Sequence, residues 1–268
     1  MRHEAALRSL RGIEIAYRLE GPADAPVVVF GNGLATTMAM WQPQADAFRA
    51  THRVLRYDVC GHGGTQASPP PYTLAELADD VAALLDALTI ARATYVGLSL
   101  GGEIAQSLAV RHADRLEALV LCDTTMGDRR AMWEERIARV QAEGLEPQVE
   151  PAMQRWFTPA FRRDHPDLVE AMRGMVRSTA IEGYVGCAMA MRDATLREQT
   201  SSIRLPTLVI TGEQDLSTPP GEAERLHRAI AGSRLALIAH AAHLPNIEQA
   251  ATFNALLRDF LAARAPSA

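Results

Sequence analysis

The sequence predicts an α/β fold with a mostly parallel central sheet, helices on both of its faces and a helical cap inserted between two of its strands. Three observations predict it. Short apolar runs alternate with amphipathic helical patterns over the first half of the chain. The same alternation returns near the C-terminal end, and the long stretch between the two parts holds helical patterns without a convincing strand. Such an alternation is typical of a parallel sheet that is covered by helices.

The first half of the chain carries most of the predicted strands. An alternation of apolar and polar residues predicts an opening hairpin with strands at 6–10 and 13–19. A capping-box pattern, Thr73 followed by Glu76, predicts the start of a helix at residue 74. The other predicted strands are 27–30, 53–57, 93–96 and 118–122, and the predicted helices are 41–50, 74–88 and 100–112.

Residues 127–204 interrupt this rhythm. Trp133, Ile137 and Val140 recur there at helical spacing. The last part of the chain resumes the alternation, with predicted strands at 207–211 and 234–239 and predicted helices at 219–230 and 247–262. We therefore expect a core made of residues 1–126 and 205–268, and a helical cap made of residues 127–204.

The composition excludes some classes of function. A chain of 268 residues can bury a core large enough to need no disulfide or structural metal. The net charge is −5 and no dense run of arginine occurs, so neither nucleic acid nor an anionic membrane is an expected partner. All 27 basic residues are arginine, which excludes mechanisms that use a lysine as base or as Schiff-base former.

The cysteines and the start of the chain bear on the compartment. Cys60, Cys122 and Cys187 are odd in number and far apart, a pattern that predicts free thiols in a reducing compartment. The first residues lack the apolar segment of a secretory leader, and no apolar run approaches the length of a membrane span. The sequence therefore predicts a cytoplasmic protein.

A G-x-S-x-G motif, residues 97–101, stands between a predicted strand and a predicted helix. In a strained strand-to-helix turn of this kind, side chains larger than hydrogen two residues on either side of the serine would clash. The turn lifts the hydroxyl above the sheet edge and directs the helix N-terminus at developing negative charge. The flanking strand and helix favour Ser99 as a nucleophile over an ordinary turn serine, and they predict an α/β-hydrolase fold.

A serine hydroxyl needs a base to remove its proton. In this fold the chain order is serine, acid, histidine, and His243 follows the last predicted strand, as that order requires. His240 is the close alternative, but it lies at the end of the strand itself. His62 precedes the serine and has the wrong chain position. We therefore predict His243 as the base.

The acid should lie on a loop after a core strand and before the histidine. Asp215 follows the predicted strand 207–211, and the next helix is expected to begin with Thr218 as N-cap and Pro219 as first residue. Asp123 ends the preceding strand, a position that some relatives use, and it is the alternative acid. We favour Asp215, because an aspartate at a strand end is often only a turn former.

An oxyanion hole in this fold uses the backbone N–H after the nucleophile and one from the loop after an early strand. Leu100 supplies the first. The second lies in the glycine-rich residues 31–34, where we expect Leu34. A plain turn is the alternative interpretation of this stretch, and its place directly after the predicted strand 27–30 makes that alternative weaker.

The chain resembles the 3-oxoadipate enol-lactonases of the α/β-hydrolase superfamily over nearly its whole length. The core motifs that carry the resemblance are Asn32-Gly33-Leu34-Ala35-Thr36-Thr37, Met40-Trp41, Arg56-Tyr57-Asp58, Gly61-His62-Gly63 and Pro71-Tyr72-Thr73. The cap motifs are Arg155-Trp156-Phe157-Thr158-Pro159-Ala160-Phe161 and Glu182-Gly183-Tyr184-Val185-Gly186-Cys187. Near the C-terminal end Ala242-His243-Leu244 and Asn246-Ile247-Glu248-Gln249 also fit.

The resemblance implies hydrolysis of a small anionic enol-lactone in aromatic-compound degradation. Departures from the family pattern concern the oxyanion loop and the region near the elbow. Gly33 and Ala35 stand where the family is expected to have Ser and Gly, Cys60 where it has Arg, and Asp123 where it has Asn.

An anionic substrate needs a cationic partner, and arginine binds a carboxylate bidentately. In the cap the candidates are Arg130, Arg155 and Arg192, each with a solvated helix charge as the alternative. Trp133 and Trp156 are candidate walls of the pocket, with a place in the cap's own core as the alternative.

Two other functions compete with the lactonase. A general carboxylesterase on small acyl esters would use the same triad, and a non-catalytic ligand receptor would use the same fold. Dehalogenases and epoxide hydrolases of the superfamily use an aspartate nucleophile, which Ser99 argues against. The chain has no H-E-x-x-H, C-x-x-C or dinucleotide glycine motif, so we expect a small-molecule substrate and no metal or organic cofactor.

Overall fold

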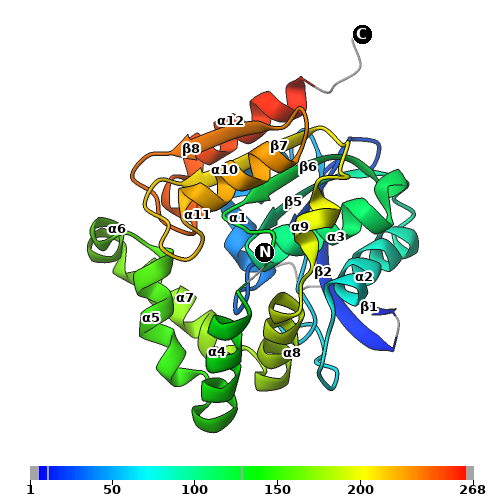
Figure 1. Ribbon diagram of the computed structural model, residues 1–268. Coiled ribbons are helices and arrows are strands. Elements are labelled where there is room, and N and C mark those ends of the chain that lie inside the picture. The colour runs from blue at the N-terminus through cyan, green and yellow to red at the C-terminus, as the bar shows by residue number, and fades with distance from the viewer. Residues whose placement is uncertain (1–5, 11, 128, 264–268) are drawn as a thin grey trace.

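The computed structural model describes residues 6–10, 12–127 and 129–263, and within these ranges one eight-stranded sheet runs through the molecule (Figure 1). The strand order is β1-β2-β4-β3-β5-β6-β7-β8. β1 and β2 are antiparallel to their neighbours, and the other strands are parallel. The strands are β1 (Ala6–Leu10), β2 (Ile13–Glu20), β3 (Val27–Gly31), β4 (Arg53–Tyr57), β5 (Ala93–Leu98), β6 (Leu116–Cys122), β7 (Thr207–Gly212) and β8 (Arg234–Ile238). The predicted α/β fold class is confirmed.

Helices cover the sheet on both faces (Figure 1). One face carries α1 (Gln42–Phe48) and α12 (Ala250–Ala262), which contact each other. The other carries α2 (Leu74–Ala87), α3 (Leu100–Arg111) and α10 (Pro220–Ala229). The predicted capping box of α2 is present, because Thr73 Oγ1 accepts from the Glu76 N–H at 3.1 Å. In the described part of the chain, no helix combines the length and the apolar character that crossing a membrane requires.

A helical lobe lies between β6 and β7 in the chain and below the sheet in the view of Figure 1. Its helices are α4 (Arg130–Glu143), α5 (Glu146–Trp156), α6 (Pro159–Asp164), α7 (Pro166–Ser178), α8 (Ile181–Arg192) and α9 (Leu196–Thr200). Trp133, Ile137 and Val140 are buried along one side of α4, as their spacing predicts. We call this segment the cap from here on.

Two predicted helices differ from the observed ones at their first turns. The helix predicted at 41–50 begins with a 3₁₀ turn, η1 (Met38–Trp41), before α1. The helix predicted at 247–262 is two helices, because α11 (Pro245–Glu248) ends at Gln249, whose φ of −128° is not helical. The break brings the Glu248 side chain inward, where it is buried.

Glu248 joins the cap to the loop after β8. Its carboxylate accepts hydrogen bonds from the Thr158 N–H and hydroxyl in the cap, the first at 3.0 Å, and from the Ala242 N–H at 2.9 Å. The Leu244 N–H adds a bond to the carbonyl of Trp156 at 3.2 Å. Hydrogen bonds to a buried carboxylate are stronger than neutral ones, so this contact fixes the cap against the loop that carries His243.

Backbones also approach closely where α8 meets the loop after β4. A Cβ on Gly183 would lie 2.5 Å from both the Cα and the carbonyl oxygen of Gly61. The Ala180 N–H donates to the same carbonyl at 3.3 Å. The contact therefore requires glycine at position 183.

We expect Gly183→Ala to lower the free energy of unfolding by roughly 1–3 kcal/mol, because the added methyl overpacks a backbone contact. Gly174→Ala is the matched control in the neighbouring helix α7, since a Cβ there meets nothing within 4 Å. It should raise the free energy of unfolding by about 0.5–1 kcal/mol, as glycine is a poor helix residue. Urea unfolding of the two variants measures both effects, and equal stabilities would contradict the close-contact argument.

Candidate active site

The G-x-S-x-G motif forms a strained turn between β5 and α3. Ser99 has a φ of 55° and a ψ of −114°, outside the regions that side chains ordinarily allow. A Cβ on Gly97 would lie 2.2 Å from the Gly101 carbonyl oxygen, and one on Gly101 would lie 2.3 Å from that of Gly31. Thr124 steadies the turn by donating its hydroxyl to the Ser99 carbonyl at 2.7 Å. The turn therefore accepts only glycine at both flanking positions.

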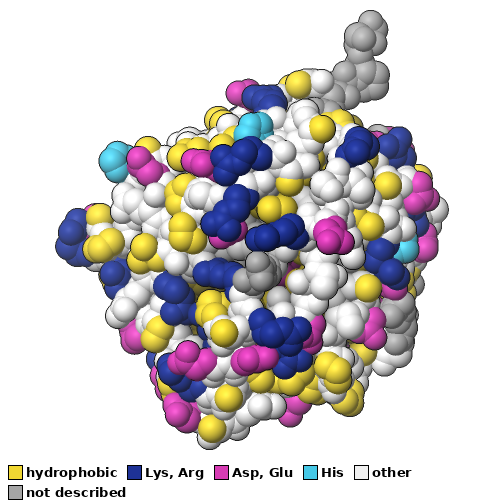
Figure 2. Space-filling view, viewed as in Figure 1, with side chains coloured by type: hydrophobic (Ala, Val, Ile, Leu, Met, Phe, Trp, Pro, Cys, Tyr) yellow, Lys and Arg dark blue, Asp and Glu magenta, His cyan; other side chains and the backbone are white. Residues whose placement is uncertain are grey.

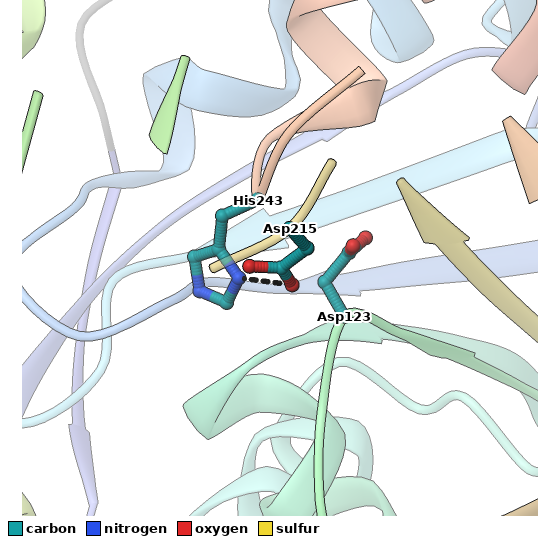
Figure 3. A group of neighbouring side chains, drawn as sticks. All are labelled: Asp123, Asp215 and His243. Atoms are coloured by element: carbon teal, nitrogen blue, oxygen red, sulfur yellow. Dashed lines mark hydrogen bonds and ion pairs between the residues drawn. The ribbon is translucent and has the colours of Figure 1, made fainter. Parts of the chain in front are cut away.

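His243 and Asp215 meet on the loops that follow β8 and β7. The Nδ1–H of His243 donates to Asp215 Oδ2 at 2.8 Å, and both side chains are buried (Figure 3). Burial alone would raise the pKa of Asp215, but the His243 charge and hydrogen bond, with hydrogen bonds from Thr218, hold it below its usual range. Asp215 is therefore an anion at neutral pH, and it leaves the Nε2 of His243 free to accept a proton.

Thr218 does not cap α10 as predicted. The helix begins at Pro220 with Pro219 at the N-cap, where no side chain caps the helix. The Thr218 hydroxyl donates instead to Asp215 Oδ2 at 2.5 Å, and the N–H groups of Ser217 and Thr218 donate to Oδ1 at 2.7 and 3.1 Å. The loop after β7 therefore positions the Asp215 carboxylate, and Thr218 does not cap α10.

Asp123 lies beside Asp215, on the side away from His243 (Figure 3). One ligand atom from each of Asp123, Asp215 and His243 falls within 4.8 Å of the others. Asp123 Oδ1 accepts the Gly212 N–H at 2.8 Å, while its buried Oδ2 finds no donor within the described residues. Burial, and then the negative charge of Asp215, raise the pKa of Asp123 well above its usual range. Burial and the Asp215 charge therefore favour the protonated form of Asp123, which can donate to Asp215.

Among the residues described, Asp123, Asp215 and His243 are close enough to one another to share a metal ion. Its chemistry does not fit such an ion well. The Asp215 oxygens already accept four hydrogen bonds, and the Nδ1 of His243 carries a proton that it donates to one of them. The arrangement is one that orients an imidazole for proton transfer.

Two backbone N–H groups are available for an oxyanion. Those of Leu34 and Leu100 have no acceptor within the described part of the chain. His62 fixes the backbone next to Leu34. Its Nε2 accepts the Ala35 N–H at 3.0 Å, and its Nδ1 donates to the Cys60 carbonyl at 3.0 Å. Burial lowers the pKa of His62 to about 4, so the ring stays neutral and keeps this tautomer. His62 therefore positions the loop, a role that its place in the sequence did not indicate.

A cavity of about 140 Å³ lies between the carboxyl ends of the strands and the cap. Ser99, His243 and Leu34 line it from the core. The cap contributes aromatic and cationic side chains, namely Trp133, Arg136, Arg155, Trp156 and Tyr184. The predicted wall residues Trp133 and Trp156 therefore face the cavity while they also pack in the cap.

The arginines around the cavity differ from those predicted. Arg155 lines it as expected, but Arg130 and Arg192 do not: each forms an ion pair with Asp193 outside, at 2.8 and 2.6 Å. Arg129 and Arg136 line the cavity instead. A signal for Arg136 was present in the sequence, because it stands three residues after Trp133 and thus on the buried side of α4. Its guanidinium lies 4.8 Å from the centre of the Trp133 ring.

Arg136 and Arg155 face the cavity without a carboxylate within salt-bridge distance in the described ranges. Burial, and then the like charge of Arg136, lower the pKa of Arg155 to about 10, which still leaves it a cation at neutral pH. Figure 2 shows arginine side chains gathered across the middle of this face, where the cap meets the core. Two neighbouring cations without an anion favour a negatively charged ligand.

Comparisons with known proteins agree with this geometry. Residues 26–250 match the family described as alpha/beta hydrolase fold. The chain is 36% identical to 3-oxoadipate enol-lactonase 2 of Acinetobacter baylyi over 90% of this chain and 91% of that protein. The solved enol-lactonase of Burkholderia xenovorans is 38% identical, with a TM-score of 0.93 over 96% of this chain and 100% of that one.

A solved hydrolase of Pseudomonas aeruginosa is similar to the same degree. It is 40% identical, with a TM-score of 0.93 over 97% of this chain and 99% of that chain. The family match spans far more than half of the sequence, and the curated relative exceeds 30% identity over almost its full length. The chain therefore belongs to the alpha/beta hydrolase family and is an enzyme of the lactonase and esterase kind.

Proposed function

We propose that this hydrolase opens a small anionic enol-lactone, of the 3-oxoadipate enol-lactone type, through an acyl-enzyme on Ser99. One observation carries the proposal. The cavity that holds Ser99 and His243 also holds Arg136 and Arg155, two cations without a described carboxylate partner. The relatives named as enol-lactonases, at 36% and 32% identity, support the same substrate class.

The first half of the reaction forms the acyl-enzyme. Ser99 Oγ attacks the lactone carbonyl while His243 Nε2 takes its proton, and Asp215 stabilises the imidazolium through Nδ1–H. The Leu34 and Leu100 N–H groups hold the oxyanion. When the tetrahedral intermediate collapses, the bond to the ring oxygen breaks, and the enol oxygen receives the proton from His243.

The second half releases the acid. The enol stays attached through the acyl chain and becomes a ketone by moving its proton to carbon. Water then attacks the acyl carbonyl with His243 as base, and Ser99 leaves with the proton. Each step uses groups of this chain, so the proposed reaction needs no metal ion and no organic cofactor.

Two further expectations belong to this proposal. The partner is a small molecule, which suits an overall charge of −5 and a buried site. The enzyme works in the cytoplasm, which suits three free and buried thiols, Cys60, Cys122 and Cys187.

A general carboxylesterase is the second candidate, because Trp133, Trp156 and Leu216 give the cavity apolar walls that accept a neutral acyl group. A panel of lactones and esters at neutral pH tests the choice. A higher kcat/KM for the enol-lactone than for p-nitrophenyl acetate supports the lactonase, and the reverse order supports the esterase. Binding of a lactone in a single turnover without further release would indicate a receptor.

Ser99→Ala removes one hydroxyl from a turn and should leave the fold intact. We expect kcat to fall by about 10⁴–10⁶, with residual catalysis from the oxyanion hole. Steady-state kinetics on either substrate, together with a thermal melt, measures both. Retention of more than about a tenth of the activity would falsify the nucleophile assignment.

Asp215→Asn and Asp123→Asn form a matched pair of changes. The first should lower kcat by about 10³–10⁴, because an amide leaves His243 in the wrong tautomer. The second should lower it by less than about 10-fold, because burial favours the protonated form of Asp123, and a neutral amide can donate to Asp215 in the same way. Kinetics on one substrate compares the two. Reversed effects would place the acid at the end of β6.

Arg155→Ala should raise KM for the anionic lactone by about 10–150-fold, since a charge-assisted hydrogen bond is worth roughly 1.5–3 kcal/mol. The KM of a neutral ester should stay nearly unchanged, because only the charged group loses its partner. Arg130→Ala is the control, as its side chain pairs with Asp193 outside the cavity. If Arg155→Ala affected both substrates alike, the esterase would become the better description.

A further inference from the structure

The backbone of His243 is held through its two neighbours in the chain. Its own N–H and carbonyl form no hydrogen bond within the described ranges. On one side the N–H of Ala242 donates to Glu248 Oε2 at 2.9 Å. On the other side the N–H of Leu244 donates to the carbonyl of Trp156 at 3.2 Å. The position of the ring therefore depends on what holds these two neighbours.

The core fixes this loop one residue before Ala242. There the Gln214 N–H donates to the carbonyl of Ala241 at 2.8 Å. From Ala242 onward the described partners of the loop are Glu248 and the cap residue Trp156. The two residues that flank the base are thus fixed by other parts of the chain than the strand end from which the loop starts.

Glu248 connects its side of the loop to the cap as well. Its side chain is only 8% exposed. Oε1 accepts the N–H of Thr158 at 3.0 Å and also the Thr158 hydroxyl, while Oε2 serves Ala242. Thr158 is itself fixed, because its hydroxyl oxygen accepts the Phe161 N–H at the first turn of α6. Hydrogen bonds to a carboxylate are stronger than those between neutral groups, so the bridge is a firm one.

The cap segment that holds the loop is next to residues that face the ligand. Arg155 and Trp156 line the cavity, and Thr158 follows two residues later. Neither Glu248 nor Thr158 occurs among the described residues that line it. These two side chains can therefore influence the reaction through the groups that they hold, and not by touching the substrate.

We propose that Glu248 is a positioning residue of this hydrolase, which holds His243 in place for proton transfer by joining Ala242 to Thr158 of the cap. The inference rests on the proposed function, in which His243 Nε2 is the base. A misplacement of a reacting group by about 1 Å can slow a reaction by about 10²-fold. Because Glu248 acts on the base, its loss slows the turnover of every substrate and leaves substrate binding unchanged.

Glu248→Gln tests the bridge with a side chain of the same shape. The amide has one acceptor oxygen instead of two, so either the Ala242 N–H or the Thr158 N–H loses its acceptor. We expect kcat and kcat/KM to fall together by about 10–100-fold, with KM nearly unchanged. The fall should be the same for the enol-lactone and for p-nitrophenyl acetate, because both use the same base.

Thr158 offers a test from the cap side of the bridge. Thr158→Val removes one donor to Glu248 and should lower kcat by about 3–10-fold, the worth of one hydrogen bond. Thr158→Ser keeps the hydroxyl and should restore the wild-type kcat. A general loss of stability would not produce this difference at constant KM.

Thr200→Val is the matched control. Thr200 lies fully buried on α9 of the cap, and its hydroxyl donates to Gln106 Oε1 on α3 at 2.7 Å, a bond between cap and core that does not involve the loop of His243. Urea unfolding should show a loss of stability similar to that of Thr158→Val. Its kcat should stay close to that of the wild type.

Proton NMR gives a readout of the ring itself. The Nδ1–H of His243, which donates to Asp215, is followed through its exchange with water. We expect faster exchange in Glu248→Gln than in the wild type, because a less restrained loop opens more often. Thr200→Val should exchange as the wild type does.

Three results would overturn the proposal: a wild-type kcat in Glu248→Gln, an effect of that change on KM alone, or a Thr200→Val variant that loses as much kcat as Thr158→Val. Thermal melts show which variants fold, and the Thr158 pair decides the question if Glu248→Gln does not. An enzyme that turns over p-nitrophenyl acetate but not the enol-lactone would contradict the proposed function, while the role of Glu248 would still be measured on the ester.

Discussion

The close contact of α3 with the carboxyl ends of β3 and β5 is the constraint on which the rest of the site depends. Gly97 and Gly101 let backbones pass at distances that no Cβ allows, and Ser99 takes a strained conformation between them. The Gly101 N–H also donates to the Asn32 carbonyl at 2.9 Å, so one contact holds the elbow and the oxyanion loop together. The strain at Ser99 is therefore balanced by the packing of the whole helix on the sheet.

The loop that carries His243 depends on the cap as much as on the core. Asp215 holds the ring from one side, and Glu248 holds the preceding residue, Ala242, while it also binds Thr158 in the cap. A displacement of the cap near α6 would therefore act on the backbone next to His243. The position of the cap and the position of the His243 ring are therefore coupled through Glu248.

Local patterns in the sequence were enough to predict the fold and the loops that carry Ser99, Asp215 and His243. Glycine spacing and helix capping act over a few residues, and the order of the three residues along the chain can be read directly. Features that depend on distant partners were not predictable in the same way. Arg130 pairs with Asp193, the residue after α8, and Thr218 donates to the Asp215 carboxylate instead of capping α10. Arg136 stands at helical spacing from Trp133, which is a local signal, but packing decides that this side of α4 faces the cavity.

The protonation of the site gives the cavity a charge that its composition does not reveal. Three acids and three arginines lie in or beside it, so by residue type they cancel. Burial raises the pKa of Glu103 to about 8 and that of Asp123 well above its usual range, while the pKa of Asp215 lies below its usual range, so the site is more positive than its residue types suggest in a protein whose net charge is −5. An electropositive inlet in an acidic protein focuses field lines onto the cavity. A positive potential at the cavity thereby concentrates small anions there, although the protein as a whole is acidic.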